Sequence, residues 1–237
     1  MNQYYDYKLS SSFLICIGIG ILTIFSNTSS LGNFVYADDL NPGVYSKDSK
    51  PFGIPYGEWL VKHTKWLFQV PLDVHPGKNF TTENCASNQS GPVWYLTLNF
   101  EKGEQRTCII PSDKAILLPI LAGFCGEWDL TYMESLTSCA KAGNEFGTIS
   151  ASVDGKEIKD LESYRAQSPI FNITLQENNV LGHTPGSGKA QNDGFYLFLE
   201  PLSPGNHTVH TSTNVNNIIA PGYNYDTDLT YHLIITP

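Results

Sequence analysis

Large apolar side chains recur every three or four positions in the segment PYGEWLVKHTKWLFQVPL, residues 55–72. This spacing places them on one face of an amphipathic helix, and a proline near each end bounds that helix. Trp59 and Trp66 are seven residues apart and therefore share the apolar face. His63 lies between them, and we interpret it as a hydrogen-bonded packing residue. We expect the helix to cover a sheet, and an exposed tryptophan platform for a sugar is the alternative interpretation.

Beyond residue 92 the apolar period changes to two, which is typical of strands. The segment 195–199 is apolar on both faces and is expected to be a central strand, whereas Pro119 favours an edge position for the run 115–120. The whole pattern predicts strands at residues 93–100, 105–110, 115–120, 148–153, 156–158, 170–175, 195–199, 207–213 and 228–236.

Two glycine-containing turns predict hairpins between these strands. Gly103 is expected to join the strand at 93–100 to the strand at 105–110. Asp154-Gly155 is the strongest two-residue hairpin signal in the chain.

The remaining segments predict a short helix and a long loop. The helix is expected at 129–141, capped by Asp129 or Thr131, with Gly143 after its end. Residues 176–193 are polar and rich in glycine, and we expect them to form a loop.

These elements predict a mainly β protein. We expect a single β-sandwich domain of jelly-roll type at residues 54–237, with an N-terminal amphipathic helix and one further short helix. Residues 38–53 are polar, contain proline and glycine, and are expected to form an extended leader.

The first 37 residues have the parts of a secretory signal peptide. Lys8 precedes a run of thirteen largely apolar residues at 13–25, and a polar stretch then ends in Val35-Tyr36-Ala37. A helix of thirteen residues rises about 20 Å, less than the ~30 Å hydrocarbon core of a bilayer, so a permanent span is disfavoured. An uncleaved N-terminal anchor is the alternative. We expect residues 38–237 to be secreted or to lie on the exterior of the cell envelope.

Four cysteines follow this segment, and their number agrees with export. An even number in an exported chain favours disulfides, and the spacings contain no Cys-x-x-Cys pair of a zinc or redox motif. Three pairings are possible. We favour Cys85–Cys108 with Cys125–Cys139, because each bond then closes a loop around one local unit. Each bond would add about 3 kcal/mol of stability by constraining the unfolded chain.

The charge of the chain narrows the classes of partner. The 237 residues carry a formal net charge of −9, and the only arginines are Arg106 and Arg165, so we expect no nucleic-acid partner. No second apolar run is long enough to span a membrane. Four sequons are candidate glycan acceptors if the host glycosylates exported proteins: Asn79, Asn88, Asn172 and Asn206.

Histidines and aspartates near the C-terminus are the candidate metal ligands. If their strands pair, His210 and His232 share one outer face, and Asp226 or His183 could supply a third ligand. Such an outward histidine pair is more often simply solvated. Asp226 and Asp228 offer oxygen ligands near the start of a strand, and they could bind a structural calcium ion. We expect no other cofactor.

Carboxylates beside aromatic residues keep a hydrolase in consideration. Acid–base hydrolysis needs two converging carboxyl groups, one of them with a raised pKa. Glu127 and Asp129 flank Trp128, and Glu58 precedes Trp59. Acidic residues are abundant in this chain, however, so chance also produces such neighbours.

Several segments together resemble a known family. They are YGEWLVKHTKWLFQVPLDVHP, NCASNQSGPVWYL, RTCIIPSDKAILLPI, VDGKEI, FLEPLSPGNHTVH and LTYHLII. In these segments, which cover most of residues 55–236, the chain is similar to a family of uncharacterised secreted proteins of bacteria and archaea. The resemblance implies export and a compact β-rich domain, and it supplies no activity, ligand or catalytic residue.

Two functional hypotheses from different classes follow. The leading one is a secreted, disulfide-bonded β-sandwich that binds an extracellular ligand at its surface, either a glycan, an envelope component or a protein, with Trp59, Trp66 and Trp128 as candidate ligand-binding residues. The alternative is an exported hydrolase, a glycosidase or a metal-dependent enzyme, acting on polysaccharide or peptide. An enzyme should gather titratable groups in one concave pocket, whereas a binding module should show a shallow aromatic face.

Overall fold

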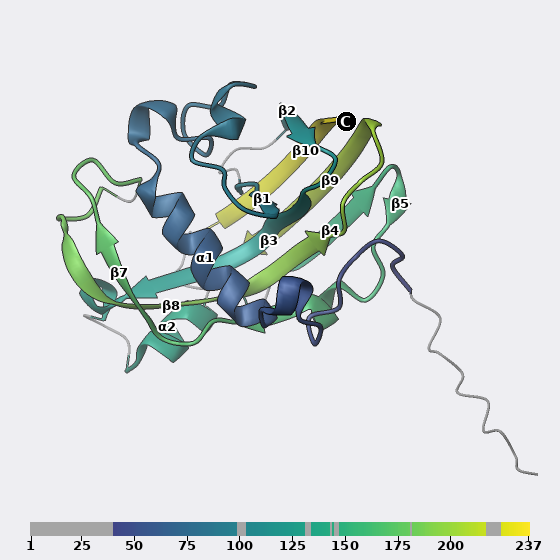
Figure 1. Cartoon of the computed structure of the whole chain (residues 1–237). Coiled ribbons are helices and arrows are strands. Elements are labelled where there is room, and N and C mark those ends of the chain that lie inside the picture. The colour runs from purple at the N-terminus through teal and green to yellow at the C-terminus, as the bar shows by residue number, and fades with distance from the viewer. Residues whose placement is uncertain are drawn as a thin grey trace, which may run out of the picture. The chain divides into compact units, whose positions relative to one another are not determined.

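The structure is a computed structural model that describes residues 40–98, 103–130, 134–142, 144, 147–180, 182–216 and 224–237. These residues belong to one compact unit of two β-sheets and two α-helices (Figure 1). The predicted mainly β sandwich is confirmed. The predicted signal peptide at residues 1–37 lies outside the described residues.

The first sheet, called sheet A here, has the strand order β1-β3-β8-β6, and β7 pairs with another part of β8. β1 and β3 are parallel, and the other pairs are antiparallel. The strands are β1 (Val93–Tyr95), β3 (Ala115–Gly126), β6 (Arg165–Gln167), β7 (Phe171–Leu175) and β8 (Gly186–Leu199).

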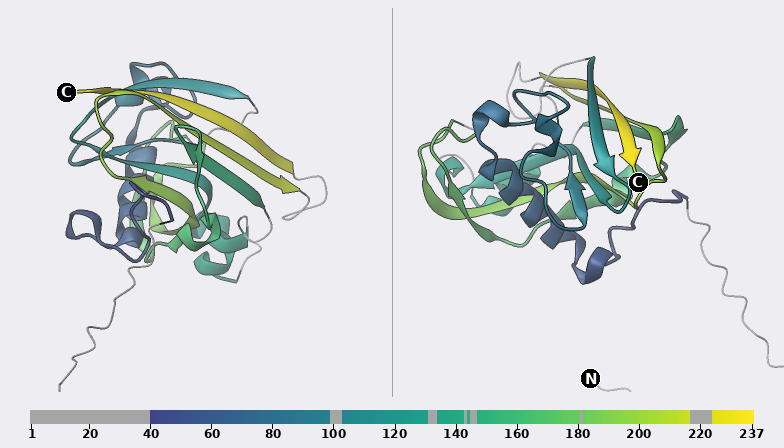
Figure 2. Two further views of the ribbon diagram at one scale, coloured as in Figure 1. Left: turned by 90° about the vertical axis from the view of Figure 1, so that its right-hand side faces the viewer. Right: turned by 45° about the horizontal axis from the view of Figure 1, so that its top comes forward.

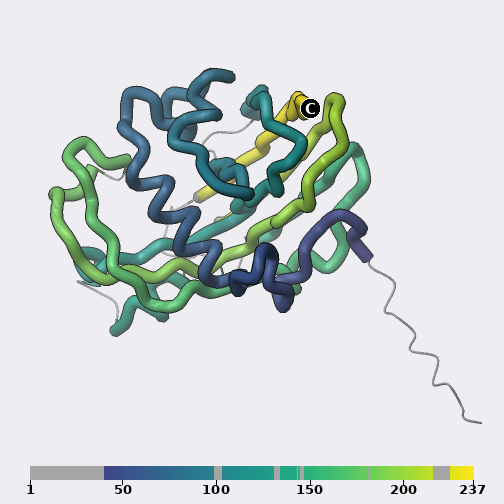
Figure 3. The backbone as a smooth tube through the Cα atoms, viewed as in Figure 1, coloured from purple at the N-terminus to yellow at the C-terminus, as the bar shows by residue number. Residues whose placement is uncertain are grey.

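The second sheet, sheet B, has the order β2-β10-β9-β4-β5. β2 and β10 are parallel, so each sheet contains one parallel pair in addition to the antiparallel pairing of a jelly roll. The strands are β2 (Glu104–Pro111), β4 (Thr148–Val153), β5 (Lys156–Glu157), β9 (Gly205–Asn216) and β10 (Asn224–Thr236). Figure 2 shows the two sheets as separate layers, and Figure 3 shows β10 running beside β9.

Sheet A is apolar on both faces because it lies between sheet B and helix α1 (Tyr56–Gln69). In β8, Phe195 and Leu197 belong to the core between the sheets, whereas Tyr196 and Phe198 pack against α1. The prediction of a central strand at 195–199 is therefore confirmed. Burying both faces of a strand removes about twice the apolar area from water that a one-sided strand would remove.

The predicted extended leader is joined to the domain by backbone pairing. Val44 forms a β-bridge with Leu199, and the Tyr45 N–H donates to the Phe198 carbonyl at 2.8 Å. Short 3₁₀ helices complete the connections: η1 (Pro51–Gly53), η2 (Leu72–Val74), η3 (Asn84–Ala86), η4 (Glu127–Asp129) and η5 (Leu161–Tyr164).

The second helix, α2 (Leu136–Ala142), begins later than the sequence predicted. The hydroxyls of Ser135 and Ser138 each accept the other residue's backbone N–H at 3.1 Å, which caps the first turn. Asp129 instead ends η4, where its carboxylate accepts the Gly126 N–H at 2.8 Å. The proposed cap Thr131 and the terminating Gly143 lie outside the described residues.

Two predictions of strand pairing are corrected. The hairpin at Gly103 is wrong, because β1 belongs to sheet A and β2 to sheet B. Pro119 does not make β3 an edge strand, since β3 lies between β1 and β8, although β1 pairs only with Ala115–Leu117 and ends before Pro119. The hairpin at Asp154-Gly155 is confirmed, with Val153 opposite Lys156.

The predicted loop at 176–193 is wrong from Gly186 onward, where β8 begins. Ser187 and Lys189 are exposed there, whereas Gln191, Asn192 and Asp193 are buried and their side chains are paired with other elements. Gln191 accepts a hydrogen bond from the Thr137 hydroxyl at 2.8 Å, and Asn192 donates to the Thr64 hydroxyl at 3.1 Å. A buried polar strand is stable when its side chains are satisfied in this way.

Both predicted disulfides are confirmed. The Cα atoms are 5.7 Å apart in Cys85–Cys108 and 5.8 Å apart in Cys125–Cys139. Such bonds form and persist in oxidising environments. Within the described part of the chain, neither helix is long and apolar enough to cross a bilayer.

Candidate functional site

The difference in length between β1 and β3 opens a space beneath helix α1. β1 pairs with three residues of β3, and β3 then continues to Gly126 with no further strand on that side in the described part of the chain. Pro119, which has no N–H to leave unpaired, lies just beyond the end of β1, and a bulge follows between Pro119 and Leu121. This open part of sheet A forms one wall of a cavity.

The cavity has a volume of about 360 Å³, within the range of ligand-sized pockets. Residues of α1, the segment 75–78, β3, β8 and the two residues 97 and 98 after β1 line it. The described lining is His63, Leu67, Phe68, His75, Gly77, Lys78, Thr97, Leu98, Pro119, Ala122, Phe124, Val180 and Tyr196. Most of these side chains are apolar or aromatic, and Lys78 is the charged residue at the exposed rim.

His63 is fully buried, and its environment fixes its protonation state. Burial lowers the pKa of His63 to about 4, and the hydrogen bond with the Leu96 carbonyl only partly opposes this effect. The ring is therefore neutral at pH 7, with its Nε2–H donating to Leu96 at 2.8 Å. The prediction that His63 is a hydrogen-bonded packing residue is confirmed, and this residue also lines the cavity.

The other buried polar groups of the lining are engaged. His75 donates from Nε2 to the Leu67 carbonyl at 2.9 Å and accepts the Gly77 N–H at Nδ1, at 3.0 Å. The Tyr196 hydroxyl donates to Asn192 at 2.9 Å. Burial lowers the pKa of His75 and raises the pKa of Tyr196, so both groups are neutral at pH 7.

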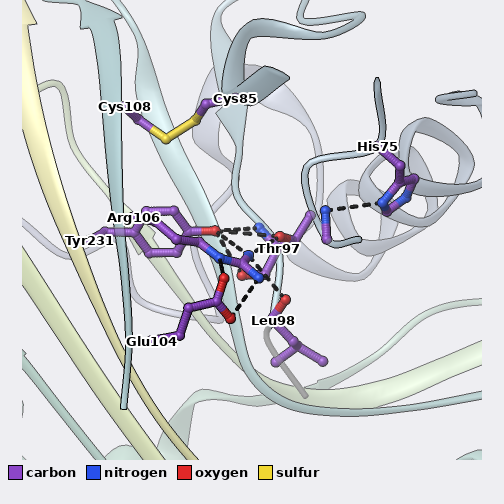
Figure 4. Close-up of polar contacts among 9 residues, drawn as sticks. His75, Cys85, Thr97, Leu98, Glu104, Arg106, Cys108 and Tyr231 are labelled. Atoms are coloured by element: carbon purple, nitrogen blue, oxygen red, sulfur yellow. Dashed lines mark hydrogen bonds and ion pairs between the residues drawn. A yellow bond between two sulfur atoms is a disulfide. The ribbon is translucent and has the colours of Figure 1, made fainter. Parts of the chain in front are cut away.

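A buried arginine holds the wall of the cavity that comes from Thr97 and Leu98 (Figure 4). Arg106 donates to the Thr97 hydroxyl at 2.7 Å, to the Leu98 carbonyl at 3.3 Å and to the Tyr231 hydroxyl at 3.1 Å. Its guanidinium also binds both carboxylate oxygens of Glu104, at 2.6 and 3.0 Å. The sequence pattern around Arg106 gives no signal of this structural role, because the residues that it binds at Thr97, Leu98 and Tyr231 come from other segments.

A larger cleft of about 710 Å³ lies between the start of β4, η5 and the β6 end of sheet A. Its charged groups are largely paired: Lys159 contacts Glu157, and Arg165 donates to Asp193 at 2.7 Å. The cavity beneath α1 is the stronger candidate site, because its floor is formed by buried side chains and its polar groups are few.

The expectation that α1 covers a sheet is confirmed, and the alternative of an exposed tryptophan platform on this helix is wrong. Trp59 and Trp66 are 3% and 5% exposed, and their indole N–H groups donate to the carbonyls of Pro51 and Ser87. They are core residues, because α1 turns its apolar face toward sheet A. Trp128 is half-buried against Phe124, with ring centroids 6.2 Å apart.

The candidate acidic residues of a hydrolase do not line either of these two pockets. Glu127 accepts the Lys189 N–H at 2.9 Å, and Asp129 accepts the Gly126 N–H, so both hold backbone in place. Glu58 is exposed in the first turn of α1. The hydrolase alternative gains no support from their placement.

The predicted pairing of the histidine strands is correct. β9 and β10 are neighbours, with His210 opposite Thr230 and His232 opposite Thr208. His210 Nε2 lies 3.1 Å from Asp228, and His232 contacts Gln105 at 3.2 Å. Of the two residues proposed as a third ligand, Asp226 and His183, the latter lies against Trp128 instead.

Among the described residues, no group of three or more histidine, cysteine, aspartate or glutamate side chains could hold a metal ion. The calcium site proposed at Asp226 and Asp228 stays a prediction.

The asparagines of the four sequons differ in the hydrogen bonds that their side chains make. Asn79 and Asn88 donate side-chain hydrogen bonds to nearby carbonyls, of Leu72 and Gln69 respectively. Asn172 and Asn206 are exposed on β7 and β9.

No family model and no curated protein matches the chain. Among solved structures, the cysteine protease inhibitor EhICP2 from Entamoeba histolytica has 15% sequence identity, a TM-score of 0.24, and coverage of 61% of this chain and 96% of that chain. The solution structure of amebosin has 11% identity, a TM-score of 0.21, and coverage of 62% and 100%. At these TM-scores, neither similarity carries an argument about this chain.

Proposed function

We propose that the protein is exported and binds a small apolar molecule in the cavity beneath helix α1. The observation that carries this proposal is the lining itself: a ligand-sized volume whose walls are mostly apolar and whose buried polar groups are neutral. Filling such a cavity removes apolar surface of both partners from water. The leading hypothesis from the sequence, a binding protein, is kept, while the site moves from an aromatic surface to the interior.

Export is supported by two independent features. The N-terminal segment has the composition of a secretory signal peptide, and two disulfides join the four cysteines that follow it. An exported protein that holds an apolar molecule shields it from water outside the cytoplasm. The glycan and protein ligands considered from the sequence have less support, because Trp59 and Trp66, two of the three tryptophans expected to bind them, are core residues.

A fluorescent apolar probe, N-phenyl-1-naphthylamine, tests the proposal on the disulfide-bonded protein purified after export. The decisive variant is Ala122→Leu, because Ala122 is a half-buried lining residue and the larger side chain fills the cavity. We expect probe binding to be at least about ten-fold weaker in this variant, which corresponds to about 1.4 kcal/mol.

Ala166→Leu is the matched control. Ala122 and Ala166 both lie opposite Gly194 of β8, one from each side, and Ala166 does not line the cavity. The control is expected to bind the probe like the parent protein, and thermal unfolding should show that both variants are folded. Absence of probe binding to the parent protein, or equal weakening by both substitutions, would overturn the proposal.

A further inference from the structure

Among the described residues that line the cavity, His63 is the one histidine that leaves a ring nitrogen without a partner. His75 uses both ring nitrogens, and the hydroxyls of Thr97 and Tyr196 are held by Arg106 and Asn192. His63 differs, because its Nε2 is bonded to Leu96 while its Nδ1 has no partner among the described residues. This nitrogen is available to accept a hydrogen bond from a molecule bound in the cavity that His63 lines.

The hydrogen bond at Nε2 determines what Nδ1 can do. The Leu96 carbonyl can only accept, so Nε2 must carry the proton. The ring is neutral, and its Nδ1 therefore presents a lone pair. A ligand that meets this atom must donate an O–H or N–H group.

The surroundings of His63 disfavour a charged ligand. Its ring lies among those of Trp66, Tyr95 and Tyr196, with centroid distances of 5.6 to 5.8 Å. The guanidinium of the buried Arg106, which holds Thr97 and Leu98, is already bound by both oxygens of Glu104. An ionised carboxylate placed beside His63 would lose its hydration without gaining a counter-ion.

We propose that the ligand is a neutral apolar molecule with one hydrogen-bond donor, such as a phenol, an aromatic amine or an alcohol, and that this donor binds Nδ1 of His63. The inference rests on the proposed function of the same cavity. It adds the chemical class of the ligand and its orientation, with the donor toward α1.

Three naphthalene probes of similar size separate the possibilities by calorimetry on the disulfide-bonded protein. 2-Naphthol donates a hydrogen bond, 2-methoxynaphthalene can only accept one, and 2-naphthoate carries a negative charge at pH 7. We expect 2-naphthol to bind about ten-fold more tightly than 2-methoxynaphthalene, from the net effect of one buried hydrogen bond. 2-Naphthoate is expected to bind more weakly than 2-naphthol.

Two variants test the role of His63. His63→Phe keeps a planar ring and removes the acceptor, so the two neutral probes should bind with similar affinity. His63→Gln can still donate to Leu96 and accept from the ligand, and it should retain part of the preference for 2-naphthol. If His63→Phe does not fold, the comparison of probes on the parent protein decides.

The outcomes separate this inference from the proposed function. If the neutral probes bind equally well to the parent protein and Ala122→Leu blocks them, the cavity binds apolar molecules and the inference about the donor is wrong. If 2-naphthoate binds most tightly, the inference is wrong as well, and the exposed Lys78 at the rim becomes the residue to test. If no probe binds, both proposals fail.

Discussion

The imidazole of His207 lies 2.7 Å from the carboxylate of Asp154, and this contact joins the β4–β5 turn to the start of β9. The second ring nitrogen of His207 faces the Ser203 carbonyl at 2.9 Å. Both nitrogens therefore donate when the ring is protonated. Burial opposes protonation, but the Asp154 carboxylate and the Ser203 carbonyl outweigh it and raise the pKa of His207 above 6.5.

This contact predicts a bell-shaped contribution to stability. Burial opposes ionisation of Asp154, but the His207 and Thr208 N–H groups outweigh it and lower the pKa of Asp154 below 3.8. The ionised Asp154 carboxylate stabilises the fold above pH 3.8, and this stabilisation is lost as the pH falls through its lowered pKa. The protonated His207 ring stabilises the fold below pH 6.5, and this stabilisation is lost as the pH rises through its raised pKa. Asp154→Asn keeps the turn and removes the charge, and should cost less than about 1 kcal/mol, because the pair is partly exposed.

Urea unfolding of the parent protein and of Asp154→Asn at about pH 5.5 and about pH 9 measures how the stability difference between them depends on pH, and we expect the larger difference at about pH 5.5. Asp160→Asn is the matched control, since Asp160 is also an exposed aspartate with positive φ and its side chain caps no helix. An equal difference between parent and Asp154→Asn at the two pH values would contradict the prediction.

The two arginines of the chain should respond differently to replacement by lysine. The Arg106 side chain is 2% exposed and bonds to four different residues, which one ammonium group cannot do. Arg106→Lys should therefore lower the free energy of unfolding by about 3 kcal/mol. Arg165→Lys should cost less, because that side chain is 30% exposed and lysine can still reach Asp193. Chemical denaturation of both variants tests the order, and equal losses would refute it.

Gly194 is required by the close approach of β3 to β8. A Cβ atom at this position would lie 2.4 Å from the Leu121 carbonyl oxygen and 2.7 Å from the Cα of Ala122. Since both atoms belong to the backbone, Gly194→Ala should cost about 1–3 kcal/mol. Gly188→Ala in the same strand is the control, because its closest contact is the Trp128 ring at 3.0 Å. Thermal unfolding should show the larger loss for Gly194→Ala, and the reverse order would contradict this explanation.

The two disulfides should contribute similar amounts of stability. The bonded cysteines are 23 and 14 residues apart in the sequence. By restricting the unfolded chain, each bond should therefore add about 3 kcal/mol to the free energy of unfolding. Two double variants test this, Cys85→Ala with Cys108→Ala and Cys125→Ala with Cys139→Ala. Each should unfold at a lower urea concentration than the parent, and a double variant as stable as the parent would show that its bond contributes nothing.

Local patterns in the sequence predicted the elements that depend on local chemistry. Helix α1 follows from the spacing of its apolar residues, and the β4–β5 hairpin follows from Asp154-Gly155. The pairing of strands that are distant in the sequence was harder to predict from local patterns. The hairpin expected at Gly103 failed because no local signal tells that β1 and β2 belong to different sheets.

The beginning of β8 was missed for a different reason. The first half of β8 is polar and rich in glycine, which is typical of a loop. It forms a strand because residues far away in the sequence satisfy the buried polar side chains of Gln191 and Asn192. The cavity was missed as well, since it arises from the unequal lengths of β1 and β3. Two signals pointed toward it: Pro119 in an apolar strand and His63 on an apolar helix face.

The parallel pairing of β2 with β10 also constrains the time at which the protein can fold. Glu104 lies beside Leu229, and these partners are 229 − 104 = 125 residues apart in the sequence. β10 separates β2 from β9, so sheet B has no continuous hydrogen-bonded ladder until Asn224–Thr236 has been synthesised. Closing so large a loop is slow compared with forming local contacts. The nascent chain therefore stays without a complete sheet B until its last strand has been synthesised.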